Sequence, residues 1–289
     1  MLQASAKVWV IGAASFTGQY LIPALQAENY QVITTDVDIT QAKEVEGALL
    51  QIQPNYIINL AGISFVPDGE SAEIYAINTF GPQNILDASL KLKKAPTKII
   101  LASSSLIYGQ QKQETIDESC IANPTNHYGC SKWAMEQIAQ NYQDKLNIVI
   151  TRPFNYTGVA QNNKFLVPKI VEHFKKREPI IKLGNIDIWR DFSDVRWVAN
   201  VYTQLLTAET GAGINSINVC SGRLTSIRDI INQLQELSGH ELDIKSDADF
   251  IRISDMQKQS GDNSKLYNYL TNLAAPIGMK ELLSWMVAS

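Results

Sequence analysis

Short apolar runs alternate with longer amphipathic stretches along the first half of the chain. The runs are rich in β-branched residues and nearly continuous in apolar ones, which is typical of parallel strands covered by helices on both faces. Strands are predicted at 7–11, 31–35, 56–61, 98–103 and 147–152, and helices at 16–28, 42–52, 71–92 and 131–142. This alternation predicts an α/β fold with a doubly wound parallel sheet of the Rossmann type.

The rhythm loosens after Pro153. A loop is predicted at 154–163, a turn-rich β segment at 180–190, a strand at 217–219, and helices at 168–176, 195–208 and 224–239. No linker rich in Pro, Gly or Ser separates the two parts, so they should pack tightly. We expect a Rossmann domain over 1–153 and a smaller C-terminal α/β lobe over 154–289, some of whose segments return to the first domain.

Charge and composition narrow the class of protein. The chain of 289 residues carries 25 basic and 29 acidic residues, a balance that argues against a nucleic-acid partner. Three cysteines without a CxxC pair and three histidines without metal-ligand spacing indicate no disulfide framework and no metal site, and they favour a reducing cytoplasm. The first residues do not form a signal peptide, and no apolar run predicts a membrane span.

The stretch GAASFTG, from Gly12 to Gly18, lies where the first strand passes into the first helix. Small residues at such a turn let a pyrophosphate approach the amides at the helix N-terminus. Ser15 replaces the middle glycine of the usual dinucleotide-binding pattern, and an ordinary strand-to-helix turn is the alternative interpretation.

An acidic residue follows the second predicted strand, 24 positions after Gly12. Asp36 can accept hydrogen bonds from an adenosine ribose and would repel a 2′-phosphate, which favours NAD(H) over NADP(H) while leaving both open. Asp38 competes for this role, and a solvated turn acid is the alternative.

Tyr128 and Lys132 are four residues apart at the start of a predicted amphipathic helix, so their side chains should share one face. A nearby ammonium stabilises a phenolate and lowers the tyrosine pKa, which suits acid–base chemistry. Tyr108 and Lys112 have the same spacing, but Tyr108 follows a strand end and is expected in a turn. Upstream, serines at 103–105 end a strand at the edge where ligands bind in open α/β sheets, although serines there can also simply satisfy backbone groups.

Together these residues resemble the extended short-chain dehydrogenase/reductase family, the NAD-dependent epimerases, dehydratases and reductases of nucleotide sugars. Motifs follow in order across nearly the whole chain: the glycine turn, LAG at 60–62, NTFG at 78–81, the serine segment at 103–109, the Tyr128–Lys132 pair and RPFN at 152–155. The resemblance implies that Ser104, Tyr128 and Lys132 are catalytic. It implies cofactor contacts at Gly12, Ser15, Phe16, Thr17, Gly18, Asp36, Asp38, Ile39, Leu60, Ala61, Gly62, Asn78, Tyr128, Lys132 and Arg152.

The second half is similar to GDP-4-keto-6-deoxy-D-mannose reductases, which implies that 154–289 mainly binds the sugar nucleotide. The implied substrate contacts are Ser64, Ser104, Ser105, Asn155, Gln161, Val167, Lys169, Arg190, Arg223 and Arg252. Arginines suit a diphosphate because guanidinium groups pair with phosphate oxygens, while surface ion pairs with Asp191 or Asp255 are the alternative.

Leu106 stands where related dehydratases carry an acid, so dehydration is not expected. The resemblance implies a reductase of the C4 ketone of a nucleotide-linked 4-keto-6-deoxy sugar, used in surface polysaccharide synthesis. A 4-epimerase with tightly held NAD and a non-catalytic dinucleotide sensor are the alternatives. Relatives often dimerise through helices equivalent to 71–92 and 131–142, which implies a homodimer.

Overall fold

The computed structural model describes residues 5–64, 71–247 and 257–289. Six parallel strands form the main sheet, in the order β10-β6-β4-β3-β1-β2. In chain order these are β1 (Lys7–Ile11), β2 (Gln31–Thr34), β3 (Tyr56–Asn59), β4 (Lys98–Ala102), β6 (Ile148–Pro153) and β10 (Ile214–Val219). The strand order reverses between β1 and β3, and this reversal is where ligands bind in such sheets.

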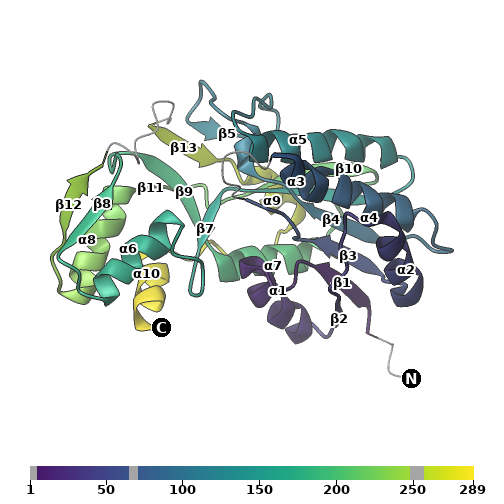
Figure 1. Cartoon of the computed structure of the whole chain (residues 1–289), viewed down its shortest axis with the longest axis horizontal. Helices are drawn as coiled ribbons and strands as arrows, with labels where there is room; N and C mark the ends of the chain where they lie inside the picture. Colours follow the sequence, from purple (N-terminus) through teal and green to yellow (C-terminus); the bar gives the residue numbers. More distant parts are fainter. Residues whose placement is uncertain (1–4, 65–70, 248–256) are drawn as a thin grey trace.

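Helices cover both faces of this sheet (Figure 1). Val8 and Val10 of β1 pack in the core with α1 (Phe16–Ala27), α7 (Val195–Leu205) and α9 (Ser264–Tyr269). Trp9 and Ile11 point the other way, into the core with α2 (Ala42–Ile52), α4 (Gly81–Ser89) and α5 (His127–Ala139). Alternate residues are thus apolar on both faces, as the sequence pattern requires. The predicted Rossmann-type α/β fold is confirmed.

A smaller lobe lies beside the sheet and has its own apolar core (Figure 1). It consists of α6 (Leu166–Lys175), α8 (Ile227–Ser238), α10 (Met279–Ala288) and the parallel pair β8 (Ile180–Leu183) and β12 (Asp243–Ser246). A mixed sheet follows the order β11-β9-β13-β5, and β7 also pairs with β9. Its strands are β5 (Thr115–Ile116), β7 (Asn155–Thr157), β9 (Trp189–Asp194), β11 (Leu224–Ser226) and β13 (Lys258–Gly261).

The predicted helix at 71–92 is interrupted. The chain forms α3 (Ser71–Tyr75), then a π-helical turn (Ala76–Phe80), then α4. The turn places Asn78 and Thr79 against α5, where Asn78 Nδ2 donates to the Ser131 hydroxyl and Thr79 Oγ1 donates to the Ser131 carbonyl. These tertiary hydrogen bonds hold the π-helical turn in place, and the apolar periodicity of the segment does not report them.

Two other boundaries differ from the sequence expectation. Helix α5 begins at His127 rather than at 131, because the Asn126 side chain caps it by accepting a hydrogen bond from the amide of Gly129. Tyr128 therefore lies in the first turn of the helix. The predicted loop at 154–163 contains β7, which pairs with β9 through Asn155 and Phe192.

Candidate active site

Glycines hold the turn between β1 and α1 tightly. Gly12 has a φ of +80°, and a Cβ there would lie 2.6 Å from the backbone nitrogen of Ala61. A Cβ on Gly18 would collide with the carbonyl of Ala13. The Ser15 hydroxyl caps α1 by accepting a hydrogen bond from the amide of Gly18 at 3.1 Å. Only glycine allows this close approach of backbones.

The N-terminus of α1 opens onto a cavity of about 730 Å³ between the main sheet and the smaller lobe. Ser15, Phe16 and Thr17 line it. The first-turn amides of a helix have no intrahelical acceptor, and the helix dipole makes this end positive. The turn therefore fits the pyrophosphate of a dinucleotide, which these amides would hold.

The segment after β3 continues the lining of the same cavity through Leu60 and Gly62. The buried Asn78 side chain accepts from the amide of Ile63 and donates to its carbonyl, both at 2.9 Å, and so fixes this segment. A Cβ on Gly62 would lie 3.0 Å from both Lys132 Nζ and Asn78 Oδ1. Asn78 is thus outside the cavity lining and holds the lining segment through its backbone.

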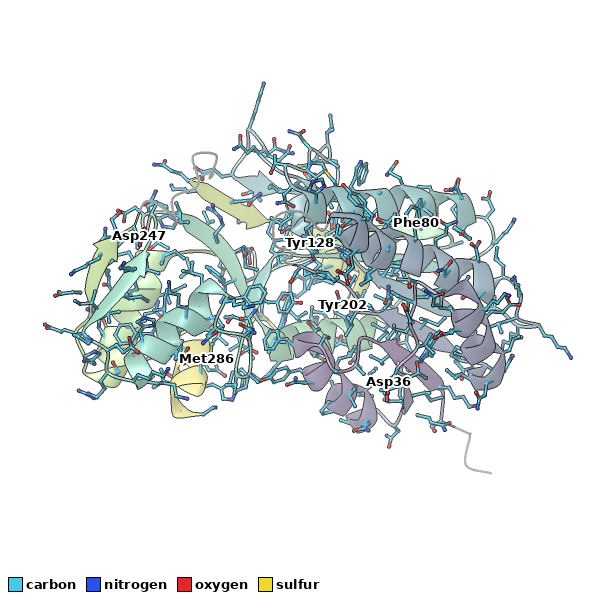
Figure 2. The ribbon with its side chains drawn as sticks, viewed as in Figure 1. Asp36, Phe80, Tyr128, Tyr202, Asp247 and Met286 are labelled. Carbon is cyan, nitrogen blue, oxygen red and sulfur yellow. The ribbon has the colours of Figure 1, made fainter. Side chains whose placement is uncertain are left out.

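The acids predicted to hold the adenosine ribose follow β2 and lie outside the cavity lining. Asp36 is exposed, and Figure 2 shows it apart from Tyr128. Asp38 accepts hydrogen bonds from the amide and hydroxyl of Thr40, which lower its pKa and occupy it in a local turn. Ile39 is buried in the core. Asp36 is the more available of the two acids, and its role stays a prediction.

Tyr128, Lys132 and Ser104 meet beyond the carboxyl end of β4, and all three line the cavity. Lys132 Nζ lies 6.0 Å from the centre of the Tyr128 ring and donates to the carbonyl of Ala102 at 2.8 Å. A hydrogen bond joins the Ser104 side chain to Tyr128. The Ser104 hydroxyl also accepts from the amide of Leu106 at 3.1 Å, which fixes its position at the strand end.

Burial sets the protonation of this group. It raises the pKa of Tyr128, the neighbouring Tyr156 raises it further, and only the bond to Ser104 opposes them. We expected Lys132 to lower this pKa; the structure shows the opposite net direction because packing disfavours the phenolate. Burial also lowers the pKa of Lys132 to about 8, against the effect of Glu136. Near neutral pH, the pKa of each group therefore keeps Tyr128 protonated beside a charged Lys132.

A buried ion pair that the sequence analysis missed supports these residues. Glu136, one helical turn after Lys132, accepts hydrogen bonds from Arg152 Nε at 3.1 Å and Nη2 at 2.6 Å and from the Ser103 hydroxyl at 2.5 Å. Burial disfavours the charge of Arg152, but the bonds and charge of Glu136 outweigh it and raise its pKa. Glu136 is four residues after Lys132, so helix spacing could have predicted that it shares the buried face of α5. The guanidinium of Arg152, predicted to bind cofactor, is thus held beneath the site, and Arg152 does not line the cavity.

The second Tyr–Lys pair of the sequence plays no part in the cavity. Tyr108 is fully buried, where its hydroxyl donates to Asn218 Oδ1 at 2.7 Å and accepts from Arg152 Nη1 at 2.9 Å. The expected turn is a short 3₁₀ helix, Ser105–Ile107, and Tyr108 is its C-cap residue with a buried side chain.

Most predicted substrate contacts converge on the cavity from both sides. Those that line it are Ser64, Ser104, Asn155, Gln161, Val167, Lys169 and Arg190. Ser105 and the exposed Arg223 do not, and Arg252 and Asp255 lie outside the described residues. Leu106 also lines the cavity and is 47% exposed. The side of the cavity formed by the smaller lobe is largely apolar, with Phe165, Leu166, Val167, Leu183, Ile186 and Ile188.

Two tyrosines of the cavity were not predicted. The hydroxyl of Tyr156 is 2.8 Å from Thr17 Oγ1, and that of Tyr202 is 2.6 Å from Thr151 Oγ1. Tyr202 and Tyr128 both line the cavity, and Figure 2 labels them in the middle part of the molecule. The sequence analysis assigned no role to either tyrosine.

Two negative findings apply to the described ranges. Within 5–64, 71–247 and 257–289 no group of three or more His, Cys, Asp or Glu side chains could hold a metal ion. In the same ranges no helix is long and apolar enough to cross a membrane.

The chain is similar in sequence and structure to known enzymes of nucleotide-sugar metabolism. The chain is 35% identical over 271 residues to GDP-6-deoxy-D-talose 4-dehydrogenase of Aggregatibacter actinomycetemcomitans, covering 92% of each chain. It is 29% identical to GDP-6-deoxy-D-mannose reductase of Pseudomonas aeruginosa, covering 91% of this chain and 90% of the relative. The structure of RMD from Pseudomonas aeruginosa complexed with NADPH superposes with a TM-score of 0.88 at 26% identity, covering 99% of this chain and 97% of the other.

Residues 8–220 match the NAD dependent epimerase/dehydratase family, a span that contains the glycine turn, the Tyr128–Lys132 pair and the RPFN segment. The match confirms the expected family and the expected class of enzyme, an NAD(P)-dependent oxidoreductase. The chain belongs to the NAD-dependent epimerase/dehydratase family.

Proposed function

We propose that this protein reduces the C4 ketone of a nucleotide-linked 4-keto-6-deoxy sugar, GDP-4-keto-6-deoxy-D-mannose or a close relative, and that it serves surface polysaccharide synthesis. The observation that carries the proposal is the protonated Tyr128, hydrogen-bonded to Ser104 beside Lys132, in a cavity that the α1 N-terminus and the smaller lobe share. One curated relative is named a 4-dehydrogenase and the other a reductase, and both names specify a GDP-linked 6-deoxy sugar.

The described residues supply the acid–base part of such a reduction. NAD(P)H, when bound, supplies the hydride. As the ketone carbon gains that hydride, Tyr128 gives its phenolic proton to the developing alkoxide, and the Ser104 hydroxyl donates a hydrogen bond to the same oxygen. The Lys132 ammonium stabilises the phenolate that remains. This ammonium is oriented by the hydrogen bond that it donates to the carbonyl of Ala102 at 2.8 Å. Donation requires a protonated tyrosine, which is the state that burial favours here.

The smaller lobe is suited to the nucleotide part of the substrate. We propose that Arg190 and Asn155 contact the diphosphate, because charged guanidinium and amide donors both match phosphate oxygens. The apolar side around Phe165, Val167 and Ile186 would take the flat faces of a nucleobase. Leu106, which has no exchangeable proton, lines the catalytic end of the cavity and argues against loss of water.

Cofactor preference and assembly are finer parts of the proposal. The exposed Asp36 favours NADH because its charge would repel a 2′-phosphate. We further propose a homodimer through the side formed by α4 and α5, where Phe80 is 54% exposed. Light scattering tests this proposal: the wild type should be a dimer and Phe80→Glu a monomer. The three free cysteines suit the proposed cytoplasmic location.

The experiment that tests the reaction follows the nicotinamide absorbance with GDP-4-keto-6-deoxy-D-mannose and either NADH or NADPH. Oxidation of one cofactor per sugar reduced supports the reductase, and the faster cofactor tests the role of Asp36. Interconversion of C4 epimers without net oxidation would replace the proposal by an epimerase. Cofactor binding without conversion of any sugar would leave a non-catalytic binder.

A further inference from the structure

Two tyrosine hydroxyls join helix α1 to the segment that follows β6. Tyr156 on β7 is hydrogen-bonded to Thr17 Oγ1 at 2.8 Å, and the hydroxyl of Tyr20 donates to the carbonyl of Val159 at 2.7 Å. Thr17 and Tyr20 are three residues apart, so they lie on one face of α1. The N-terminus of α1 is the cofactor end of the cavity, whereas segment 155–161 carries Asn155 and Gln161 on the substrate side. The contact therefore spans both ligand sites.

Aromatic rings reinforce the same contact. Phe16 stacks on Tyr156 with ring centroids 6.0 Å apart and planes 9° apart, and it meets Tyr20 edge-on at 5.7 Å. Tyr20 meets Trp285 of α10 edge-on at 5.8 Å, and the Arg196 guanidinium lies 3.9 Å from the Trp285 ring centre. Successive ring contacts thus connect Tyr156 through Phe16 and Tyr20 to Trp285 of the C-terminal helix. These contacts leave the Tyr156 ring little freedom while its hydroxyl stays hydrogen-bonded.

Segment 155–161 is itself held together around Tyr156. The Thr157 hydroxyl donates to Gln161 Oε1 at 2.6 Å, and Gln161 Nε2 donates to the Tyr156 carbonyl at 3.2 Å. Asn155 Nδ2 donates to the carbonyl of Asp191 at 3.1 Å, within the pairing of β7 with β9. A change that orders Tyr156 therefore also orders Asn155 and Gln161, two of the substrate contacts predicted from the sequence.

We propose that Tyr156 is a positioning residue that couples the two binding sites: an occupied cofactor turn orders segment 155–161 through the Thr17–Tyr156 hydrogen bond, and the nucleotide sugar then binds a segment already in place. Ordering a segment costs conformational entropy, and a second ligand that needs the same order meets a smaller cost. The coupling is reciprocal by linkage. The cofactor half rests on family membership, whereas the substrate half rests on the proposed function.

Hydrogen exchange with NADH or NADPH alone tests the cofactor half. In the wild-type protein the cofactor should slow amide exchange both in the glycine turn, 12–18, and at 158–161. In Tyr156→Phe and in Thr17→Val, each of which removes one partner of the bond, it should slow exchange only in the turn. Tyr267→Phe, whose hydroxyl lies at the far-off Ala274 carbonyl, is the matched control and should behave as wild type. Protection of 158–161 that persists in both variants, or that is absent in wild type, overturns the inference.

Binding of GDP, measured by calorimetry with and without saturating cofactor, tests the substrate half. Cofactor should tighten GDP binding by about 5-fold or more in wild type, within the usual range of such couplings. The factor should fall to near 1 in either single variant, and the double variant should lose no more than a single one. An unchanged factor in the variants rejects the coupling. Ketone reduction by wild type is assayed separately: coupling without reduction rejects the proposed function alone, and reduction without coupling rejects this inference alone.

Discussion

Replacing Glu136 by Gln tests whether the buried ion pair supports the site. The carboxylate is 2% exposed and its partner Arg152 is 8% exposed, with 2.6 Å between Nη2 and Oε2. Glutamine keeps the shape of the side chain and removes the charge, which leaves a buried guanidinium without its counter-ion. Removing one partner of a buried pair costs about 3–5 kcal/mol, so we expect a loss of that size in the free energy of unfolding.

Urea unfolding with linear extrapolation measures this loss. Ser103→Ala is the matched control, because it removes one hydrogen bond to the same carboxylate and should cost only about 1 kcal/mol. Replacing both Glu136 and Arg152 by methionine should recover much of the loss, because no charge is then left buried. A loss below about 1 kcal/mol in Glu136→Gln would refute the reasoning.

The same variant has an effect on activity that a purely structural role would not produce. The charge of Glu136 opposes the burial that lowers the pKa of Lys132 to about 8. Without that charge the pKa falls further, so the ammonium is lost at lower pH. The basic limb of the kcat/KM profile should move to lower pH in Glu136→Gln and stay in place in Ser103→Ala.

Three further predictions concern single groups. In wild type, kcat/KM for ketone reduction should fall as pH rises through about 8, because Lys132 is charged below its pKa and neutral above it; a flat profile to pH 10 would contradict this. Gly12→Ala should weaken NADH binding about 10-fold or more in a fluorescence titration. The φ of +80° is strained for a residue with a Cβ, and that Cβ would collide with the backbone of Ala61. Unchanged affinity would show that the turn is not the cofactor site. Lys98→Met should lower the free energy of unfolding by about 1–3 kcal/mol and leave kcat unchanged. Lys98 is 3% exposed, and its ammonium donates to the carbonyls of Leu205, the last residue of α7, and of Ala208 beyond it; an equal stability would contradict the prediction.

The order of strands and helices in the first half could be predicted because each strand is an apolar run with its own flanking turn. The sequence also predicted Ser104 at the carboxyl edge of the sheet, where ligands bind. Helix spacing predicted Tyr128 and Lys132 on one face of the following helix. In contrast, β7 is three residues long and depends on β9, which lies more than thirty positions away. Such short strands are set by tertiary pairing rather than by local pattern.

The buried partners of the site were harder to foresee. Arg152 has the same motif position whether its guanidinium faces a ligand or Glu136, and only the fold decides between them. The direction of the Tyr128 pKa depends likewise on how closely the site is packed, which spacing along a helix does not report. Tyr156 has no motif role, and its bond to Thr17 joins residues 139 positions apart.

The central claim is that Tyr128 is the proton donor of a C4 ketone reduction. The most direct measurement compares single-turnover reduction of GDP-4-keto-6-deoxy-D-mannose by wild type and Tyr128→Phe, with cofactor and GDP affinities measured on the same samples. The account predicts a rate about 10²–10⁴-fold lower in the variant with both affinities nearly unchanged, because only the transferable proton is lost. A variant that reduces the ketone at the wild-type rate would contradict it.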